Sequence, residues 1–242
     1  MPPIVLLFMG QLTSEAPRPS RSWQDWLGFV GILATAVWTL TGPNWLGIFV
    51  AVPVLYDVGM AVTFLVRGRA KRGVKGVVPR IVAYGSSFIV AIFLRVSGHW
   101  SPSSIGSTAF PPAVEFAGAL LVPVSFVFAF WPLWHMRRSF SIEPTARDLV
   151  TSGPYAFARH PIYTIYGINY LGVILFRPSL VLAIVLACWA ALTYVRMGYE
   201  ERVLTEAFPE YASYRKRVGA FGPRFWHRTA DPNTAGRGAE SR

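Results

Sequence analysis

A turn, two adjacent cations and a proline precede a long apolar stretch in the second half of the chain. The run reads GPYAFARHPIYTIYG (153–167), with Arg159 and His160 directly before Pro161. Proline is favoured at the first position of a helix, and it pushes the preceding residue toward an extended backbone. The free backbone N–H groups at such a helix start can bind a carboxylate or a phosphate. We therefore expect a polar-ligand site at this point.

A second polar group follows about forty residues later. Arg196 and Glu200 are four residues apart, so they lie on one face of a helix, and Glu201 is the next residue. Tyrosines stand near both groups, at Tyr155, Tyr163, Tyr211 and Tyr214. An anion-binding end, a carboxylate for an ammonium group and aromatic rings suit a zwitterionic cofactor that contains an aromatic ring.

The composition indicates that these residues are positioned by membrane helices. Of the 242 residues, 53% are hydrophobic and only 14% are charged, which lies outside the range of soluble globular proteins. The single cysteine, Cys188, lies in an apolar run, so one chain offers neither a disulfide nor a thiolate metal cluster. The start of the chain lacks a basic region before its apolar run, so we do not expect a cleaved signal peptide.

Six apolar runs predict an all-α, polytopic bundle of about six transmembrane helices. They cover roughly residues 23–42, 44–66, 81–96, 113–134, 162–176 and 179–197. The last two are separated by Arg177 and Pro178, which predicts a tight helical hairpin. The polar stretch after Met197 predicts that the last helix continues out of the membrane, breaks near Pro209 and resumes as a short helix.

The basic residues predict the orientation of the bundle. The loop 67–80 contains six Lys or Arg and no acidic residue, whereas the loop 97–112 contains no charged residue. By the positive-inside rule the first loop is cytoplasmic, and with six crossings both termini lie in the cytoplasm as well. The expected location is the cytoplasmic or inner membrane. The net charge of +11 comes largely from such basic segments, which are expected to face anionic membrane lipids. No nucleic-acid partner is expected.

The same pattern divides the chain into four regions. We expect an N-terminal extension over 1–22, a four-helix membrane region over 23–134, a catalytic region over 135–225 and a disordered tail over 226–242.

At the polar groups the chain resembles the isoprenylcysteine carboxyl methyltransferase family, with its bacterial and phospholipid-methylating relatives. The family's signature is R-H-P-x-Y followed some forty residues later by a Glu-Glu pair, here Arg159, His160, Pro161, Tyr163, Glu200 and Glu201. The runs LVTSGPYAFARHPIY and YASYRKRV extend the resemblance over about residues 147–225. One departure is Ile165, which stands where a small residue is often found.

The resemblance implies an integral membrane methyltransferase that uses S-adenosyl-L-methionine on a lipophilic or lipidated acceptor. It implies cofactor contacts at Arg147, Asp148, Leu149, Val150, Tyr155, His160, Pro161, Ile162, Tyr163 and Glu200. It also implies that Arg196 orients an acceptor carboxylate. O-methylation is therefore the favoured reaction, and S- or N-methylation are its alternatives.

Methyl transfer from a sulfonium is compatible with so few polar residues. It needs an in-line nucleophile, and orientation alone can supply roughly 7–11 kcal/mol of barrier lowering. No metal is required. A carboxylate or thiolate acceptor arrives deprotonated, whereas an amine or neutral thiol needs a base, for which Glu201 and His160 are the candidates.

Two other functions fit parts of the pattern. The first is an NADPH-dependent membrane reductase of the sterol-reductase type, and the second is a non-catalytic membrane scaffold or transporter subunit. One further residue stands apart: Asp57 lies deep within the second apolar run, where a carboxylate is costly, so a functional or paired role is expected. The oligomeric state is left open.

Overall fold

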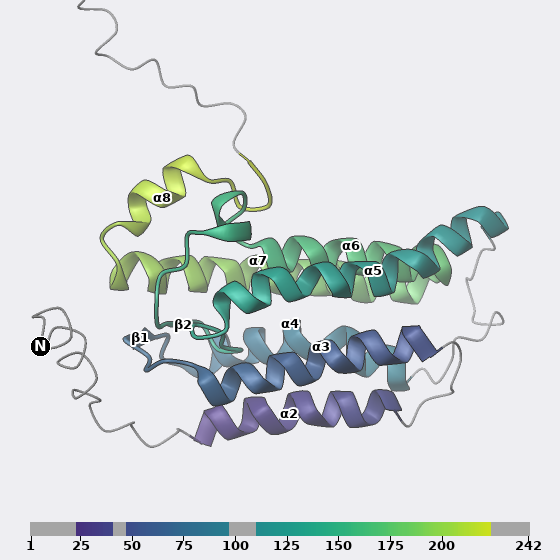
Figure 1. Ribbon diagram of the computed structural model, residues 1–242, viewed down its shortest axis with the longest axis horizontal. Coiled ribbons are helices and arrows are strands. Elements are labelled where there is room, and N and C mark those ends of the chain that lie inside the picture. Colours follow the sequence, from purple (N-terminus) through teal and green to yellow (C-terminus); the bar gives the residue numbers. More distant parts are fainter. Residues whose placement is uncertain (1–22, 41–46, 97–109, 224–242) are drawn as a thin grey trace, which may run out of the picture.

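The computed structural model describes residues 23–40, 47–96 and 110–223, and all of its long elements are helices (Figure 1). The helices are α2 (Trp23–Leu40), α3 (Gly47–Val66), α4 (Val77–Val96), α5 (Pro112–Met136), η1 (Gly153–Ala156), α6 (Pro161–Phe176), α7 (Leu180–Ala207) and α8 (Tyr211–Arg217). Two short strands, β1 (Arg72–Gly73) and β2 (Thr145–Ala146), complete the elements. The predicted all-α bundle is confirmed. The expected extension over 1–22 and tail over 226–242 lie outside the described residues.

Local sequence explains where several helices begin and end. Pro112 and Pro161 stand at the first positions of α5 and α6, as proline prefers. Ser179 caps α7 by accepting a hydrogen bond from the backbone N–H of Leu182. The helix α7 continues past the predicted membrane boundary and ends before Pro209, and α8 then begins, as the sequence predicted.

Among the described residues, three helices are long and apolar enough to cross a membrane. They are Val77–Leu94 in α4, Pro112–Met136 in α5 and Leu180–Ala207 in α7. The apolar stretches Trp26–Leu40, Ala51–Val66 and Pro161–Phe176 are shorter. All six coincide with predicted spans, and the number of six crossings stays a prediction.

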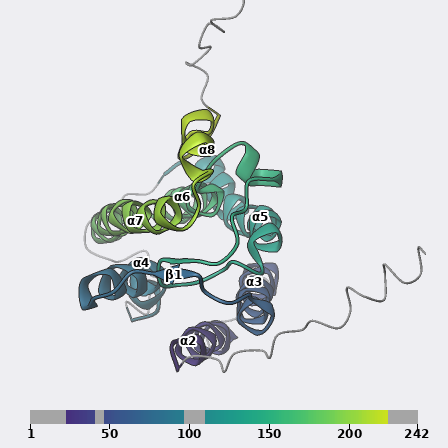
Figure 2. The ribbon, with the colours of Figure 1, turned by 90° about the vertical axis from the view of Figure 1, so that its left-hand side faces the viewer.

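The long helices lie side by side, and the remaining elements gather at one end of the bundle (Figures 1 and 2). Packing runs from α2 to α3, from α3 to α5 and from α5 to α6, while α4 packs on α7. Consecutive helices α6 and α7 contact each other much less closely than they contact α5 and α4. The predicted hairpin is therefore splayed between two supporting helices.

Glycine permits the close approach of α5 and α6. A Cβ atom at Gly118 would lie 2.6 Å from the backbone nitrogen of Phe176 and 2.8 Å from the carbonyl oxygen of Gly172. Both distances are too short for a carbon atom, so a side chain at Gly118 would separate the helices. This contact holds the C-terminal part of α6 against α5.

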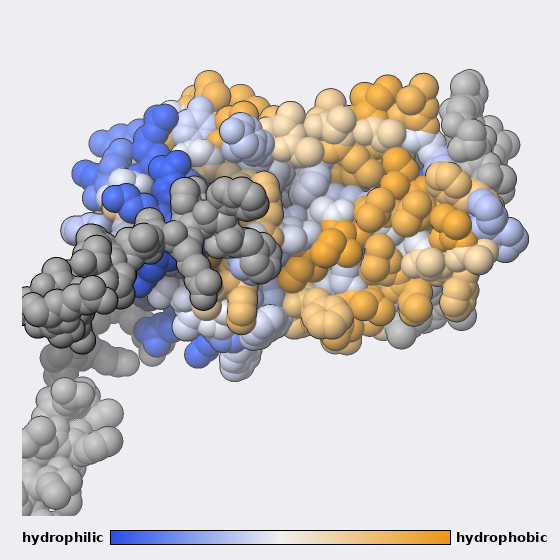
Figure 3. Space-filling model, turned by 90° about the horizontal axis from the view of Figure 1, so that it is seen from above, coloured by the Kyte–Doolittle hydropathy of each residue, from blue (hydrophilic) through white to orange (hydrophobic). Residues whose placement is uncertain are grey.

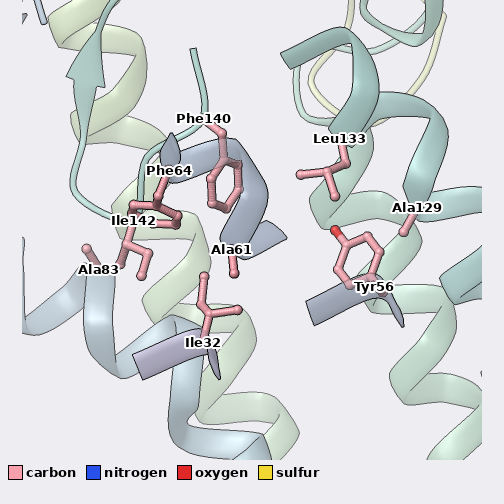
Figure 4. Close-up of a cluster of buried hydrophobic side chains, with 9 residues drawn as sticks. All are labelled: Ile32, Tyr56, Ala61, Phe64, Ala83, Ala129, Leu133, Phe140 and Ile142. Atoms are coloured by element: carbon pink, nitrogen blue, oxygen red, sulfur yellow. The ribbon is translucent and has the colours of Figure 1, made fainter. Parts of the chain in front are cut away.

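Buried apolar side chains join the first helices to the loop after α5 (Figure 4). The cluster comprises Ile32, Tyr56, Ala61, Phe64, Ala83, Ala129, Leu133, Phe140 and Ile142. The Phe64 and Phe140 rings meet edge to face at 5.6 Å, a favourable aromatic geometry. The loop after α5 is thus anchored in the core.

The polar end of the molecule is formed by the connecting segments. The strand β1 pairs antiparallel with β2, with Arg72 opposite Ala146 and Gly73 opposite Thr145. This pairing joins the basic loop 67–80 to the segment that precedes η1. Hydrophilic residues gather at this end, whereas hydrophobic residues cover most of the visible helical body (Figure 3).

Candidate functional site

A cavity of about 860 Å³ begins at the polar end and continues between the helices. Its lining contains all ten positions expected to contact a cofactor, namely Arg147, Asp148, Leu149, Val150, Tyr155, His160, Pro161, Ile162, Tyr163 and Glu200. Residues from α2 to α7 form its inner part, and Glu115 near the start of α5 lines it as well. The cavity therefore connects a polar end to an apolar interior.

The histidine–proline corner is held by the C-terminal segment. The backbone N–H groups of Arg159 and His160 donate to the carbonyl oxygens of Gly219 and Ala220, both at 2.9 Å. His160 precedes α6 with φ −127° and ψ 58°, a non-helical conformation that agrees with its place before Pro161. Its side chain is 5% exposed and stacks on the Tyr163 ring at 5.6 Å. The imidazole is thus fixed in position.

Glu200 lies at the centre of the polar end of the cavity. Its Oε1 accepts hydrogen bonds from the Tyr163 hydroxyl at 2.6 Å and from Arg196 Nε at 2.9 Å. Its Oε2 lies 3.7 Å from His160 Nδ1. Because both strong bonds end on Oε1, Oε2 keeps the capacity to accept a hydrogen bond from a ligand.

Glu201 points away from this cavity. Its carboxylate accepts hydrogen bonds from Arg159 Nε at 2.9 Å and from His160 Nε2 at 3.1 Å, and it lies 3.1 Å from Arg215 Nε. It is absent from the lining of the large cavity and instead lines a small surface pocket. The geometry therefore places Glu201 behind His160, where it orients the imidazole.

Arg196 is buried, and its guanidinium is surrounded by protein acceptors. Besides Glu200, Nη1 donates to Ser87 Oγ at 2.8 Å and to Ser86 Oγ at 3.2 Å on α4. Nη2 donates to the carbonyl oxygen of Ile142 at 2.6 Å. These bonds join α7 to α4 and to the loop after α5. Arg196 lines the cavity, but its donors already have partners in the protein.

Tyrosines of α8 line the polar end of the cavity. The Tyr214 hydroxyl donates to the carbonyl oxygen of Tyr155 at 2.6 Å. Burial raises the pKa of Tyr214 to about 12, so this hydroxyl keeps its proton at neutral pH. Tyr211 is 1% exposed, and its hydroxyl has no hydrogen-bond partner among the described residues. It lines the cavity and is available to a ligand.

The segment before η1 forms another part of the cavity wall. Arg147 donates to the carbonyl oxygen of Gly68, and burial lowers its pKa below the usual value. Ser139 Oγ accepts from the backbone N–H of Asp148 at 3.3 Å and donates to its carbonyl oxygen at 2.9 Å. Gly153 adopts a left-handed φ of +61° and packs against His135, which explains the glycine in this turn.

A group of residues lies deeper in the cavity, and the sequence analysis did not predict that they lie together. Tyr166 and Tyr170 follow Tyr163 at helical spacing and line the cavity, together with Asp57. The spacing 163, 166 and 170 places three tyrosines on one helix face, a signal that was available in the sequence. Asp57, for which no partner was predicted, accepts a hydrogen bond from Thr35 at 3.0 Å.

Comparison with known proteins agrees with this arrangement. Residues 114–211 match the family model described as phospholipid methyltransferase. The segment includes the histidine–proline corner, the Glu pair and most of the cavity wall from α5 to α7.

Two curated relatives are named for metal resistance. The cobalt-zinc-cadmium resistance protein CzcN of Cupriavidus metallidurans is 46% identical over 77 residues, which are 31% of this chain and 36% of that protein. The nickel-cobalt-cadmium resistance protein NccN of Alcaligenes xylosoxydans xylosoxydans is 32% identical over 136 residues, which are 56% of this chain and 60% of that protein. The chain thus matches less than two thirds of either relative's length. Within the described residues no group of three His, Cys, Asp or Glu could hold a metal ion.

The apolar helices and the family match together define an integral membrane protein. Residues 114–211 match the phospholipid methyltransferase family model, which confirms for this segment the resemblance that the sequence motifs indicated.

Proposed function

We propose that this protein is a membrane methyltransferase that transfers a methyl group from S-adenosyl-L-methionine to a lipophilic acceptor. The observation that supports this most strongly is the single cavity that all ten expected cofactor positions line. A water-soluble cofactor can enter at its polar end, and an acceptor can occupy its apolar interior.

The chemistry of the lining fits this cofactor. Glu200 Oε2 can accept a hydrogen bond from an ammonium group, and the buried hydroxyls of Tyr211 and Thr145 have no protein partner among the described residues. The rings of Tyr155 and Tyr163 provide apolar and cation-attracting surface beside the carboxylate. Buried polar atoms without protein partners are expected where a polar ligand binds.

When bound, the cofactor supplies a methyl group on a sulfonium centre and leaves as a neutral thioether. The residues of the chain then have to orient the two reactants and exclude water, which accounts for much of the acceleration in such reactions. The C-terminal segment lies against the polar end through its bonds to Arg159, His160 and Tyr155, and it thereby limits the access of water to that end.

His160 is the residue that we propose for proton transfer. Glu201 accepts a hydrogen bond, so it places the imidazole proton on Nε2 and leaves Nδ1 on the side of Glu200 and the cavity. Nδ1 can then accept a proton from an acceptor that arrives protonated. Glu201 acts through His160 and is a positioning residue.

Arg196 also acts by positioning in this proposal. Its donors bind Glu200, two serines and the Ile142 carbonyl oxygen, so an acceptor carboxylate would have to displace one of them. The preference for a carboxylate acceptor depended on Arg196 and gains no support from this geometry. The proposed reaction therefore includes methylation at oxygen, sulfur or nitrogen, without a preference for oxygen.

Calorimetric titration of the purified protein in neutral detergent with S-adenosylhomocysteine tests the proposal. We expect binding that Glu200→Gln weakens strongly. Absence of binding would overturn the proposal, and binding of NADPH instead would favour the reductase.

A further inference from the structure

We propose that Asp57 and its neighbours form a binding site for a protonated amine on the lipophilic acceptor. This site lies in the same cavity as the proposed cofactor site but deeper in the bundle. The inference rests on the proposed function, because it names a property of the acceptor.

Asp57 is a carboxylic acid near the middle of α3, directly after the fully buried Tyr56. In the part of the chain that the structure describes, Thr35 is its one hydrogen-bond partner, and no Lys or Arg pairs with it. The Thr35 hydroxyl also lies 2.7 Å from the Ile32 carbonyl oxygen, and a single O–H cannot donate fully to both. A carboxylate at this depth is costly without a cation. A cationic ligand would supply the missing charge.

A second, independent feature lies in the same cavity. Thr193 on α7 is 4% exposed and lines the cavity, yet its hydroxyl has no hydrogen-bond partner among the described residues. It lies one helical turn before Arg196, on the cavity side of α7. A buried hydroxyl without a partner indicates a polar ligand atom nearby.

Three tyrosines lie near the carboxylate. Tyr56, Tyr166 and Tyr170 are close enough to Asp57 to interact with its charge. The hydroxyls of Tyr56 and Tyr166 lie 3.0 Å apart, and the rings of Tyr166 and Tyr170 are 6.4 Å apart. A carboxylate with tyrosines nearby suits an ammonium group, which is attracted by the negative charge and by aromatic rings. A neutral or anionic polar group would lack this complementarity.

The position of this group relative to the cofactor site follows from helix geometry. Tyr166 and Tyr170 lie three and seven residues after Tyr163, whose hydroxyl binds Glu200. At a rise of 1.5 Å per residue, these steps are about 4.5 and about 10 Å along the helix axis. Tyr166 and Tyr170, which interact with Asp57, therefore lie within about 10 Å of Tyr163 along α6, so we place the amine of the acceptor near the polar end of the cavity. The site selects the acceptor by a charge near its reacting end.

The test compares two single-chain probes of equal length, dodecylamine and 1-dodecanol, with the full chain in neutral detergent. Binding is followed by the concentration dependence of the thermal unfolding midpoint. We expect dodecylamine to bind at least about tenfold more tightly than dodecanol, and Asp57→Asn to abolish that preference. Glu115→Gln is the matched control, because it removes another carboxylate from the same cavity, and it should leave the preference unchanged.

Equal binding of the two probes, or an unchanged preference in Asp57→Asn, would overturn the inference. If Asp57→Asn does not fold, Thr193→Val replaces a buried hydroxyl at nearly constant shape, and an unchanged amine affinity in that variant would overturn it equally. Titration with S-adenosylhomocysteine separates the two proposals. Cofactor binding without amine selectivity would support the proposed function and rule out the amine site. Amine selectivity without cofactor binding would support the amine site and rule out the proposed function.

Discussion

Glu200 and Glu201 are neighbours in the chain, yet their carboxylates face different sides of α7. Glu200 lines the large cavity and binds Tyr163 and Arg196, whereas Glu201 binds Arg159 and His160 outside that cavity. Successive residues on a helix are about 100° apart, so an adjacent acidic pair can serve two compartments. His160 lies between the two carboxylates and is the link between them.

The first prediction separates the roles of the two carboxylates. Glu200→Gln should weaken S-adenosylhomocysteine binding by at least about tenfold, because the carboxylate partner of an ammonium group is lost. Glu201→Gln should change that affinity by a smaller factor, since Glu201 does not line the cavity. Calorimetric titration of both variants checks this order. Equal losses in the two variants would contradict the separation.

The second prediction concerns turnover and the His160 imidazole. His160→Ala should abolish methyl transfer to an acceptor that needs deprotonation. Glu201→Gln should lower kcat and shift its pH profile, because it alters the hydrogen bond to Nε2. The measurement is initial rate against pH for the wild type and both variants. A Glu201→Gln profile that superimposes on the wild type would remove the positioning role.

The third prediction is that Arg196 stabilises the fold. Its removal leaves Glu200, two serine hydroxyls and the Ile142 carbonyl oxygen without their donor, so Arg196→Ala should cost about 3–5 kcal/mol of unfolding free energy. Arg196→Lys keeps the charge but cannot reach all of these acceptors, and should recover part of the loss. Thermal unfolding in detergent compares the three proteins. Wild-type stability in Arg196→Ala would be the contrary result.

The fourth prediction tests the contact between α5 and α6. Gly118→Ala should destabilise the protein by about 1–3 kcal/mol, because the new methyl group would overlap the backbone of α6. Gly167→Ala is the matched control: no atom lies within 4 Å of the added Cβ, and alanine favours a helix, so it should be neutral or slightly stabilising. Unfolding midpoints of the two variants give the answer, and equal effects would argue against the close packing.

The fifth prediction concerns the Tyr214 hydroxyl. Tyr214→Phe removes the hydrogen bond to the Tyr155 carbonyl oxygen and should cost about 1 kcal/mol. The folded-state pKa of Tyr214 is raised from 10.0 to about 12, so this stability is present below pH 10 and is lost as the pH rises through about 12. The difference in unfolding free energy between wild type and variant should therefore be constant near neutral pH and shrink at high pH. A difference that grows with pH would contradict this assignment.

The sequence determined the elements and the chemistry of the polar end. Long apolar runs can satisfy their backbone groups only as helices in a membrane, so all six predicted runs became helices. Proline at the start of α6 and the four-residue spacing of Arg196 and Glu200 act locally, and both gave the predicted geometry.

The tertiary structure decided how the helices pair and where each polar side chain points. No local pattern shows that α6 packs on α5 and α7 on α4, because close approaches such as that of Gly118 and Gly172 depend on residues far apart in the chain. Packing between distant segments also decides that Glu201 lies outside the cavity and that Arg196 binds the Ile142 carbonyl oxygen. It likewise places Asp57 and Tyr166 in the lining of one cavity. A residue type limits which partners are possible, but packing between distant segments determines which of them are in reach.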